Sequence, residues 1–402
     1  MPNLPPLESR SSRSGRTIYL DYHASTPCDP RVVEAMLPFF LDCYANPSSA
    51  THQAGREAAA AVEEARAGVA GVLGAEPGEV VFTSGATESN NLSILGAAEF
   101  APKGRNRVLA SAIEHKSVLE AGKALTKSGF EFEIIPVDRD GLLDLGALSR
   151  LVDDRTLLVS VQAANNEIGA IQPVLEVTQI AHATGALVHC DAAQALGRIP
   201  MDVGDWGVDL LSISGHKCYG PKGVGALYVR GGARFAALGP LVFGGGQEHE
   251  IRPGTLNVPG IAGLGRACEI AQAVLQPEII RVTRLRDRFE SALMERLRDT
   301  TRNGALTRRL AGNSSLLIHG VDADALIANL PGVALSTGSA CTSGAPEPSY
   351  VLQAIGLSRE EAYSTIRVGI GRFSMQNELD DAASMICAAA EHIRQIQVPT
   401  CA

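Results

Sequence analysis

Lys217 ends a segment in which small and apolar residues, Ser-Ile-Ser-Gly-His at 212–216, are typical of the end of a strand. A lysine amine at a strand end can form a Schiff base with a carbonyl compound. Most lysines are solvated surface charges, so Lys217 alone indicates little about function. Its chemistry depends on which acids and anion-binding groups the fold brings to it.

A carboxylate, Asp191, directly follows the apolar segment 187–190. The cofactor pyridoxal phosphate (PLP) needs an acid beside its pyridine nitrogen, because the protonated ring then acts as an electron sink. The alternative role of Asp191 is a helix N-cap, which the following Ala-Ala-Gln permits. Because Lys217 follows Asp191 along the same series of strands, we favour a PLP site that contains both residues.

A strand, a glycine turn and a helix start follow one another at 82–90, with the sequence Phe-Thr-Ser-Gly-Ala-Thr-Glu-Ser-Asn. Free main-chain N–H groups and the positive end of a helix attract a phosphate, and the Thr87 hydroxyl adds a donor. Such turns are also common joints without a ligand. The place of this turn in the first strand-to-helix connection favours a phosphate site.

Eight cysteines occur in the chain, and no two have the Cys-x-x-Cys spacing of a zinc or redox site. They are Cys28, Cys43, Cys190, Cys218, Cys268, Cys341, Cys387 and Cys401. Cys341 lies in a run of small residues, 336–344, which favours a mobile loop. From these residues alone, Cys341 is either a small buried hydrophobe or a reactive thiol on such a loop.

The elements that must position these residues alternate between strands and helices. Strands are predicted at 80–83, 108–112, 130–136, 157–162, 187–190 and 210–214. Amphipathic stretches separate them, including a helix at 174–184 that ends before Gly185. This alternation predicts an α/β fold with a mainly parallel sheet, whose carboxyl edge is where ligands bind.

The pattern changes after residue 262, where helices are predicted at 264–275 and 278–298 and a strand near 315–319. A last amphipathic helix is expected at 378–396, with a packing role. We therefore expect a disordered tail at 1–17, a large cofactor-binding domain at 18–262 and a small domain at 263–402. Residues 18–29 could pack with the small domain.

Composition excludes several classes of protein. The 402 residues include 45% hydrophobic and 20% charged residues, as in a globular enzyme with two cores. The formal net charge is −9 without a basic cluster, so direct nucleic-acid binding is not expected. No apolar run approaches the length of a membrane span, and residues 1–17 lack the apolar segment of a secretory signal. Together with the cysteine usage, these features predict a cytoplasmic protein.

Together these residues resemble the cysteine desulfurases of the NifS/IscS type, which are class-V aminotransferases among the fold-type I PLP enzymes. The shared motifs follow the family's order over most of the chain. They lie at 19–22, 46–49, 85–88, 114–115, 165–169, 191, 214–217, 252–257, 338–350 and 366–368. The resemblance implies a large domain with a mainly parallel seven-stranded sheet and a smaller α+β C-terminal domain.

The resemblance also implies the cofactor site. Lys217 would hold PLP through a Schiff base, Asp191 would pair with the pyridine nitrogen, and Gln194 would hydrogen-bond the phenolic oxygen. His115 would lie over the ring. The remaining cofactor-binding residues would be Ala86, Thr87, Ser214, His216 and, from the second subunit of a homodimer, Thr255.

For the substrate, the resemblance implies that Arg367 and Asn166 clamp the carboxylate of L-cysteine, with Asn46 also in the substrate site. Lys217 would remove the Cα proton, and His115 would handle the proton of the substrate thiol. Cys341 would take the sulfur as a persulfide and L-alanine would leave. The persulfide would pass to an acceptor protein, in iron–sulfur cluster assembly or in thiolation of RNA or DNA.

Two residues depart from the family pattern. His23 stands where a small residue is usual, and Cys218 stands where a bulkier apolar residue is usual. We expect Cys218 to have a packing role, and neither residue is assigned a chemical one.

Four other functions compete with the desulfurase. A selenocysteine lyase would use the same site, and a transaminase would need no thiol at Cys341. A non-catalytic sulfur-relay scaffold would not need Lys217, Asp191 and His115. A cysteine hydrolase would pair Cys341 with a histidine and would leave the PLP residues without a purpose.

Overall fold

The computed structural model describes residues 17–232, 238–337 and 347–397. The predicted tail at 1–17 therefore lies almost wholly outside the described residues, and so does Cys341. Within the described part of the chain, no helix is both long and apolar enough to cross a membrane.

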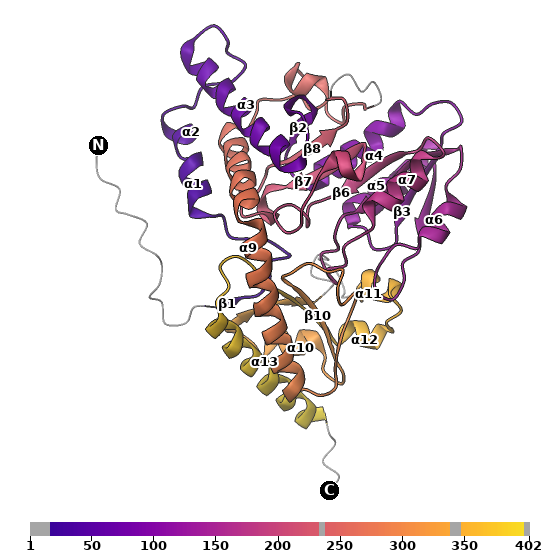
Figure 1. Ribbon diagram of the computed structural model, residues 1–402, viewed down its shortest axis with the longest axis vertical. Coiled ribbons are helices and arrows are strands. Elements are labelled where there is room, and N and C mark those ends of the chain that lie inside the picture. Colours follow the sequence, from indigo (N-terminus) through magenta and orange to yellow (C-terminus); the bar gives the residue numbers. More distant parts are fainter. Residues whose placement is uncertain (1–16, 233–237, 338–346, 398–402) are drawn as a thin grey trace.

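A seven-stranded sheet with the order β2-β8-β7-β6-β5-β3-β4 forms the centre of the larger part of the molecule (Figure 1). Its strands are β2 (Val80–Thr83), β3 (Arg107–Ser111), β4 (Glu131–Ile135), β5 (Thr156–Gln162), β6 (Leu187–Asp191), β7 (Leu210–Ser214) and β8 (Gly225–Val229). All neighbours pair in parallel except β8, which is antiparallel to β2 and β7. The predicted, mainly parallel seven-stranded sheet is confirmed.

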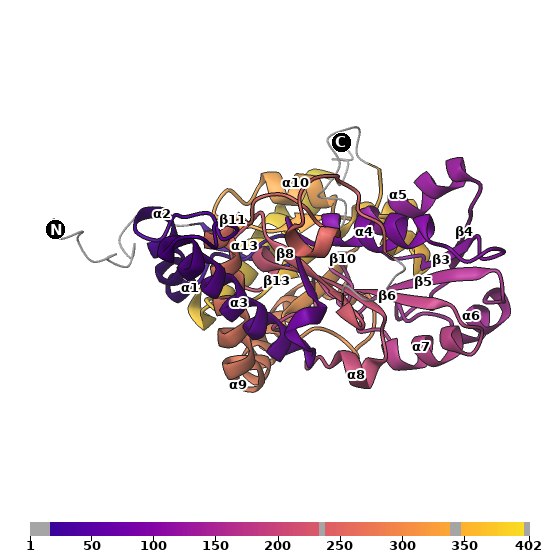
Figure 2. The same cartoon turned by 90° about the horizontal axis from the view of Figure 1, so that it is seen from above.

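Helices cover both faces of this sheet, because successive strand residues point to opposite sides. One face packs against α4 (Ala86–Glu99) and α5 (Lys116–Leu125), and Figure 2 shows both helices on that side. The other face packs against helices that include the first part of α9. They are α3 (Gln53–Leu73), α6 (Leu145–Leu151), α7 (Val174–His182), α8 (Val203–Trp206) and α9 (Val258–Arg296).

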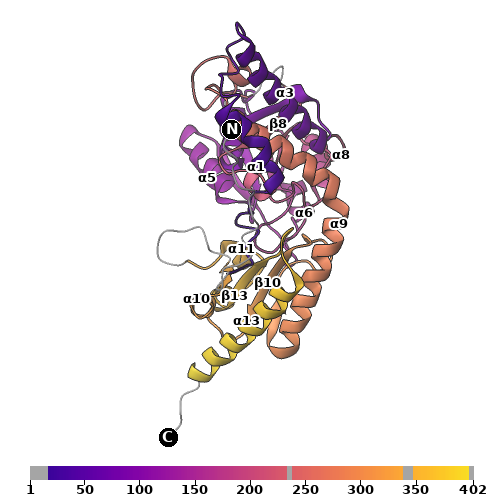
Figure 3. The same cartoon turned by 90° about the vertical axis from the view of Figure 1, so that its left-hand side faces the viewer.

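The second part of the molecule has its own sheet and core. Strands β9 (Thr300–Arg302), β10 (Asn313–Ile318), β12 (Ser336–Thr337) and β13 (Thr365–Gly369) form an antiparallel sheet in the order β12-β13-β10-β9. Figure 3 shows α9 and α13 (Gln376–Gln397) beside it. The remaining helices there are α10 (Ala323–Ala328), α11 (Tyr350–Ala354) and α12 (Arg359–Tyr363).

The first strand of the chain, β1, belongs to this second part, although most of the residues that follow it form the first part. Strand β1 (Ile18–Tyr19) pairs in parallel with β11 (Val333–Ala334), and two short helices, α1 (Pro30–Met36) and α2 (Pro38–Leu41), follow. The segment between β1 and α1 therefore passes between the two cores. Several of its main-chain groups contact the candidate site.

Helix α9 joins the two parts as one continuous helix of 39 residues (Figure 1). The expectation of separate helices at 264–275 and 278–298 is wrong, since Pro277 lies inside the helix. A proline in a helix interior costs about 3 kcal/mol. Burial on both sides of Pro277 offsets that cost, because the first half of α9 packs in the large core and the second half in the small core. The expected boundary at residue 262 falls within this helix.

Candidate active site

Strands β2, β6 and β7 end at the same edge of the large sheet, because they run in the same direction. Asp191, the last residue of β6, pairs in register with Ser212 of β7, and Ser214 ends β7. The short 3₁₀ turn Gly215–Lys217 then brings Lys217 to that edge. The two residues first suggested by the sequence, Asp191 and Lys217, thus come from neighbouring strands.

The Lys217 side chain reaches toward the segment between β1 and α1. Its Nζ donates hydrogen bonds to the main-chain oxygens of His23 (2.6 Å) and Ala24 (2.8 Å). Thr26 fixes this segment, since its N–H and its hydroxyl both donate to the main-chain oxygen of His216 at 2.9 Å. The lysine is therefore held at the edge of the sheet by main-chain acceptors.

Asp191 accepts two hydrogen bonds. Its Oδ1 accepts from the main-chain N–H of Ala193 at 2.9 Å, and its Oδ2 accepts from Asn90 Nδ2 at 2.8 Å. A turn follows Asp191, so the alternative role as a helix N-cap does not apply. Asn90 lies on α4 and is fully buried.

Gln194 is oriented by residues that sequence reasoning did not place in the site. Its Nε2 donates to the main-chain oxygen of His23 at 2.8 Å, and Arg198 donates to its Oε1. Arg198 also donates to His23 Nδ1 (2.7 Å) and to the main-chain oxygen of Lys217 (3.1 Å). Burial, together with the charges of Arg198 and Arg367, lowers the pKa of His23 well below its usual value. His23 is thus a neutral part of this cluster.

His115 is the N-cap of α5, and its residue is exposed. Loss of surrounding water lowers the pKa of His115; the charge of Asp191 opposes this effect, and the charges of Lys217 and Lys116 add to it. The preceding residue, Glu114, is fully buried, and burial raises the pKa of its carboxyl well above the usual value, with the Asp191 charge adding to the rise.

The phosphate loop predicted from the sequence lies beside Ser214. Gly85 is the N-cap of α4 with φ +147°, and no side chain caps the helix, which leaves its first N–H groups available. A Cβ atom built on Gly85 would lie 3.6 Å from Ser214 Oγ, and one on Gly225 would lie 2.6 Å from Gly85 Cα. Glycine at 225, the first residue of β8, therefore permits the loop to approach β8 next to Ser214 of β7.

This cradle fits the phosphate of PLP. Thr87 lies in the first turn of α4 and is exposed, at the helix end that attracts an anion. His216 is half-buried, and burial with the nearby charges of Lys217 and Lys222 lowers its pKa to about 4. A neutral His216 can donate a hydrogen bond to a phosphate. The donor set of helix N–H groups, Thr87, Ser214 and His216 matches the group that the sequence predicts.

Arg367 offers a donor for a substrate carboxylate. One guanidinium nitrogen, Nη2, donates to Asp21 Oδ1 at 2.8 Å, and Ser336 Oγ donates to the same oxygen at 3.0 Å. Arg367 Nε is buried and has no hydrogen-bond partner among the described residues. A buried guanidinium N–H without a partner costs free energy, and a bound carboxylate would satisfy it.

The other predicted residues are less closely tied to this site. Asn166 follows β5 at the same edge and is half-buried. Asn46 lies on an exposed loop, where its Oδ1 accepts from Ser48 N–H at 2.9 Å. Thr255 is exposed, and its neighbour Arg252 donates to Glu88 Oε1 of α4 at 2.8 Å. Cys341 lies outside the described residues.

Cys218 lies in the large core and is 1% exposed. Burial raises the pKa of its thiol to about 12, so it stays protonated at neutral pH. Its position next to Lys217 in the sequence reflects packing under the site. A Cβ atom built on Gly197 would lie 2.8 Å from Cys218 Sγ, which indicates how closely this region packs.

Comparisons with known proteins agree with this geometry. The family model described as Aminotransferase class-V matches residues 18–381. A Rickettsia felis protein named Cysteine desulfurase IscS is 46% identical over 379 residues, which cover 94% of this chain and 92% of that relative. A solved structure described as a NifS-like protein has a TM-score of 0.87 at 38% identity and covers 94% of this chain and 100% of its own. Another, described as SspA in complex with cysteine, has a TM-score of 0.78 at 37% identity and covers 89% and 99%.

Proposed function

This chain belongs to the class-V aminotransferase family and is a PLP-dependent cysteine desulfurase, and from this premise we propose which residues carry out its reaction. One observation supports the proposal most strongly. Neighbouring strands β6 and β7 bring Asp191 and Lys217 to one edge of the sheet, where the charges of both act on His115. When bound, PLP supplies an electron sink that makes the Cα and Cβ bonds of an amino acid reactive.

The cofactor would be held by residues at this edge. Lys217 would bind its aldehyde carbon, Asp191 its pyridine nitrogen and Gln194 its phenolic oxygen. Its phosphate would lie at the start of α4, where Ala86 and Thr87 offer main-chain N–H groups, with Ser214 and His216 as further donors. The Arg198 contact to Gln194 Oε1 supports this arrangement, because it orients the amide so that Nε2 donates to the main-chain oxygen of His23, which also accepts from Lys217.

The substrate would enter beside the small domain. Arg367 Nε, buried without a partner among the described residues, would donate to the carboxylate of L-cysteine, and Asn166 would add a second donor. Asn46 would contact the substrate from an exposed loop. Once the amino group of L-cysteine has displaced it, the Lys217 amine would be free to take the Cα proton.

Cys341 would carry the sulfur. Its thiolate attacks Sγ of the bound L-cysteine, an S–S bond forms and the Cβ–Sγ bond breaks. The electron pair stays with the three-carbon product, which takes up protons and leaves as L-alanine. An enzyme thiol and L-cysteine thus give an enzyme persulfide and L-alanine without an external oxidant or reductant.

A homodimer would complete the site. Thr255 would reach the phosphate of the other subunit, and its exposure leaves the side chain free to do so. An exposed apolar segment before it, Leu241 to Phe243, supports a covering second copy, since these side chains are 38%, 62% and 82% exposed. Sedimentation should show a dimer, and Phe243→Asp should weaken it. A monomeric wild-type protein would contradict this proposal.

The persulfide would pass to an acceptor protein outside this chain. As the family resemblance implies, the acceptor would serve iron–sulfur cluster assembly or thiolation of RNA or DNA. The chain itself would bind no nucleic acid, since its net charge is −9. We propose a cytoplasmic location for it.

A single-turnover experiment tests the roles of these residues. The PLP-loaded protein is incubated with L-cysteine, alanine is quantified, and the sulfur adduct is located by mass spectrometry. We expect one extra sulfur on Cys341 and one alanine per site, and no alanine from Lys217→Ala or Cys341→Ala. Cys43→Ala, which changes another thiol that is not fully buried, serves as the matched control and should retain activity.

Two outcomes would contradict the proposal. If Cys341→Ala formed as much alanine as the wild type, Cys341 would not be the sulfur carrier. PLP that still forms a covalent bond in Lys217→Ala would remove the assigned role of Lys217.

A further inference from the structure

Asn90 connects two residues of the proposed site through one nitrogen atom. It lies on the buried side of α4, and its Nδ2 donates to Asp191 Oδ2 at 2.8 Å and to Ser117 Oγ at 2.9 Å. Ser117 in turn contacts His115. A chain of hydrogen bonds therefore runs from the carboxylate at the end of β6 to the histidine at the start of α5.

The orientation of the Asn90 amide follows from Asp191. A flipped amide would place Oδ1 against the carboxylate oxygen, so that two acceptors would repel each other. In the orientation observed, Asn90 Oδ1 is buried without a hydrogen-bond partner among the described residues. Leaving a buried acceptor unpaired is costly, and the charge-assisted bond to Asp191 offsets this cost.

The protonation of His115 follows from Ser117. The main-chain N–H of Ser117 donates to His115 Nδ1 at 3.1 Å, and a main-chain N–H can only donate. Nδ1 therefore carries no proton. Ser117 Oγ lies 2.8 Å from the same nitrogen and accepts from Asn90 on its other side, so its hydroxyl donates to Nδ1 as well.

We propose that Asn90 and Ser117 are positioning residues that hold His115 in the tautomer with its proton on Nε2 and that link it to Asp191. This inference rests on the proposed function, with His115 over the cofactor ring and near the substrate thiol as the family resemblance implies. His115 then presents a hydrogen-bond donor to the substrate sulfur and does not act as its base. The proton of the substrate thiol must pass to another group or to water.

The protein without PLP provides a test that is independent of turnover. Nitrogen-15 NMR of histidine-labelled protein distinguishes the two tautomers, and His115→Gln identifies the His115 signals among the nine histidines. We expect a neutral ring protonated on Nε2. A wild-type ring protonated on Nδ1 would overturn the inference.

Two variants test the positioning role itself. Asn90→Ala releases the Ser117 hydroxyl, which can then accept a proton from Nδ1. We expect the protonated fraction of His115 at a given pH to rise about tenfold, the effect of losing one hydrogen bond. Ser117→Ala should act in the same direction, because it removes a donor to Nδ1 and keeps the main-chain N–H. It also covers the case in which Asn90→Ala does not fold.

The neighbouring Asn91→Ala is the matched control, since Asn91 donates to the main-chain oxygens of Thr87 and Ser117 and does not touch His115. It should leave the His115 titration unchanged. Folded Asn90→Ala and Ser117→Ala proteins with wild-type titration would overturn the inference. If the NMR result is as expected but L-cysteine yields no alanine, the proposed function fails and the tautomer assignment stands.

Discussion

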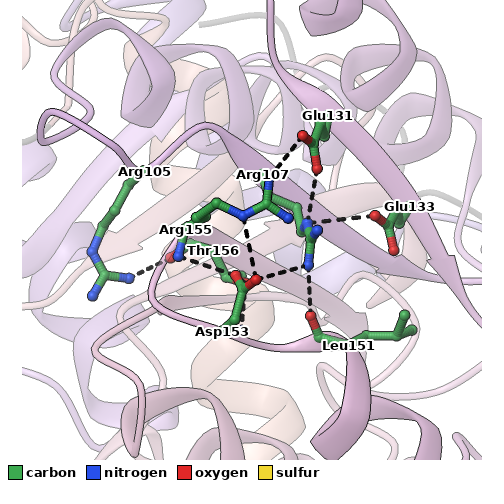
Figure 4. Close-up of polar contacts among 8 residues, drawn as sticks. All are labelled: Arg105, Arg107, Glu131, Glu133, Leu151, Asp153, Arg155 and Thr156. Atoms are coloured by element: carbon green, nitrogen blue, oxygen red, sulfur yellow. Dashed lines mark hydrogen bonds and ion pairs between the residues drawn. The ribbon is translucent and has the colours of Figure 1, made fainter.

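Two groups of polar side chains at opposite edges of the large sheet differ in how well they are paired. The arginine network lies at the amino ends of β3, β4 and β5 (Figure 4) and consists of Arg105, Arg107, Glu131, Glu133, Asp153 and Arg155. The site cluster lies at the carboxyl edge and on the small domain beside it, and consists of Asn90, Glu114, Glu167, Asp191 and Arg367.

Every charge in the arginine network has a partner of opposite sign or a main-chain partner. Arg107 pairs with Glu131 at 3.1 Å and with Asp153 at 3.2 Å, and Arg155 pairs with Glu131 at 2.9 Å. In contrast, Asn90 Oδ1, Glu114 Oε2 and Arg367 Nε of the site cluster are buried without partners among the described residues. Unpaired buried atoms cost stability, and a bound carboxylate would satisfy Arg367 Nε.

The largest expected difference between the two edges is in how the free energy of unfolding depends on pH. Glu167 is buried against Ser349, whose hydroxyl donates to its Oε2 at 2.5 Å. Burial raises its pKa to about 7, against smaller opposing effects of Ser349, Arg367 and Lys116. Because the folded protein binds this proton more tightly, stability should fall by up to about 3 kcal/mol as pH rises from about 4.5 to about 7. Calorimetric melting across this range measures it, and Glu167→Gln should flatten the slope.

Glu131 of the arginine network should show the opposite sign. Hydrogen bonds from Arg107 and Arg155 lower its pKa, so its contribution is present above its unfolded pKa and is lost as pH falls. Glu131→Gln should therefore lower the melting temperature at pH 7 and change it little at pH values below the unfolded pKa, where Glu131 is already protonated. Equal effects of the two substitutions at pH 7 would show that the edges do not differ in this way.

Arg367→Lys should have the next largest effect, on activity. Lysine keeps the charge but loses the planar fork and the buried Nε donor, so kcat/KM for L-cysteine should fall about a hundredfold, equal to about 2.7 kcal/mol. Alanine formation under steady-state conditions measures it. Arg107→Lys makes the same exchange in the arginine network and should leave kcat/KM within about twofold of wild type. A similar loss in both variants would indicate a general effect on folding.

Much of the fold could be predicted because buried strands have a clear local pattern. β2 and β7 were predicted with their observed ends, since short β-branched runs between turns mark them. β8 was missed, because its sequence begins with Gly225 and Ala226, and both residue types are depleted in strands. α9 was divided at Pro277, because the two cores that hold the helix together form only on folding.

The site residues also fall into those that the sequence predicts and those that it does not. Asp191 and Lys217 could be predicted, because each follows an apolar run and strand ends meet at one edge. Asn90 and Arg198 could not be assigned roles, since their partners lie far away in the sequence. Asn90 left one weak signal, a polar residue on the buried side of a helix. A contact that forms only through tertiary packing produces no periodic pattern of hydrophobic residues from which it could be predicted.

The smallest expected effect comes from Arg155, at the outer side of the arginine network. Its side chain is 43% exposed, as is that of its partner Glu131, so water and salt screen the pair. Arg155→Ala should lower the free energy of unfolding only slightly at low salt and by less at 1 M salt, without a change in kcat/KM. Urea unfolding at both salt concentrations measures it. Because Arg107 retains Asp153 and the main-chain oxygen of Leu151 when Arg155 is removed, the rest of the network should persist. A loss of activity in Arg155→Ala would mean that the paired edge of the sheet also supports the reaction, and the contrast between the two edges would not hold.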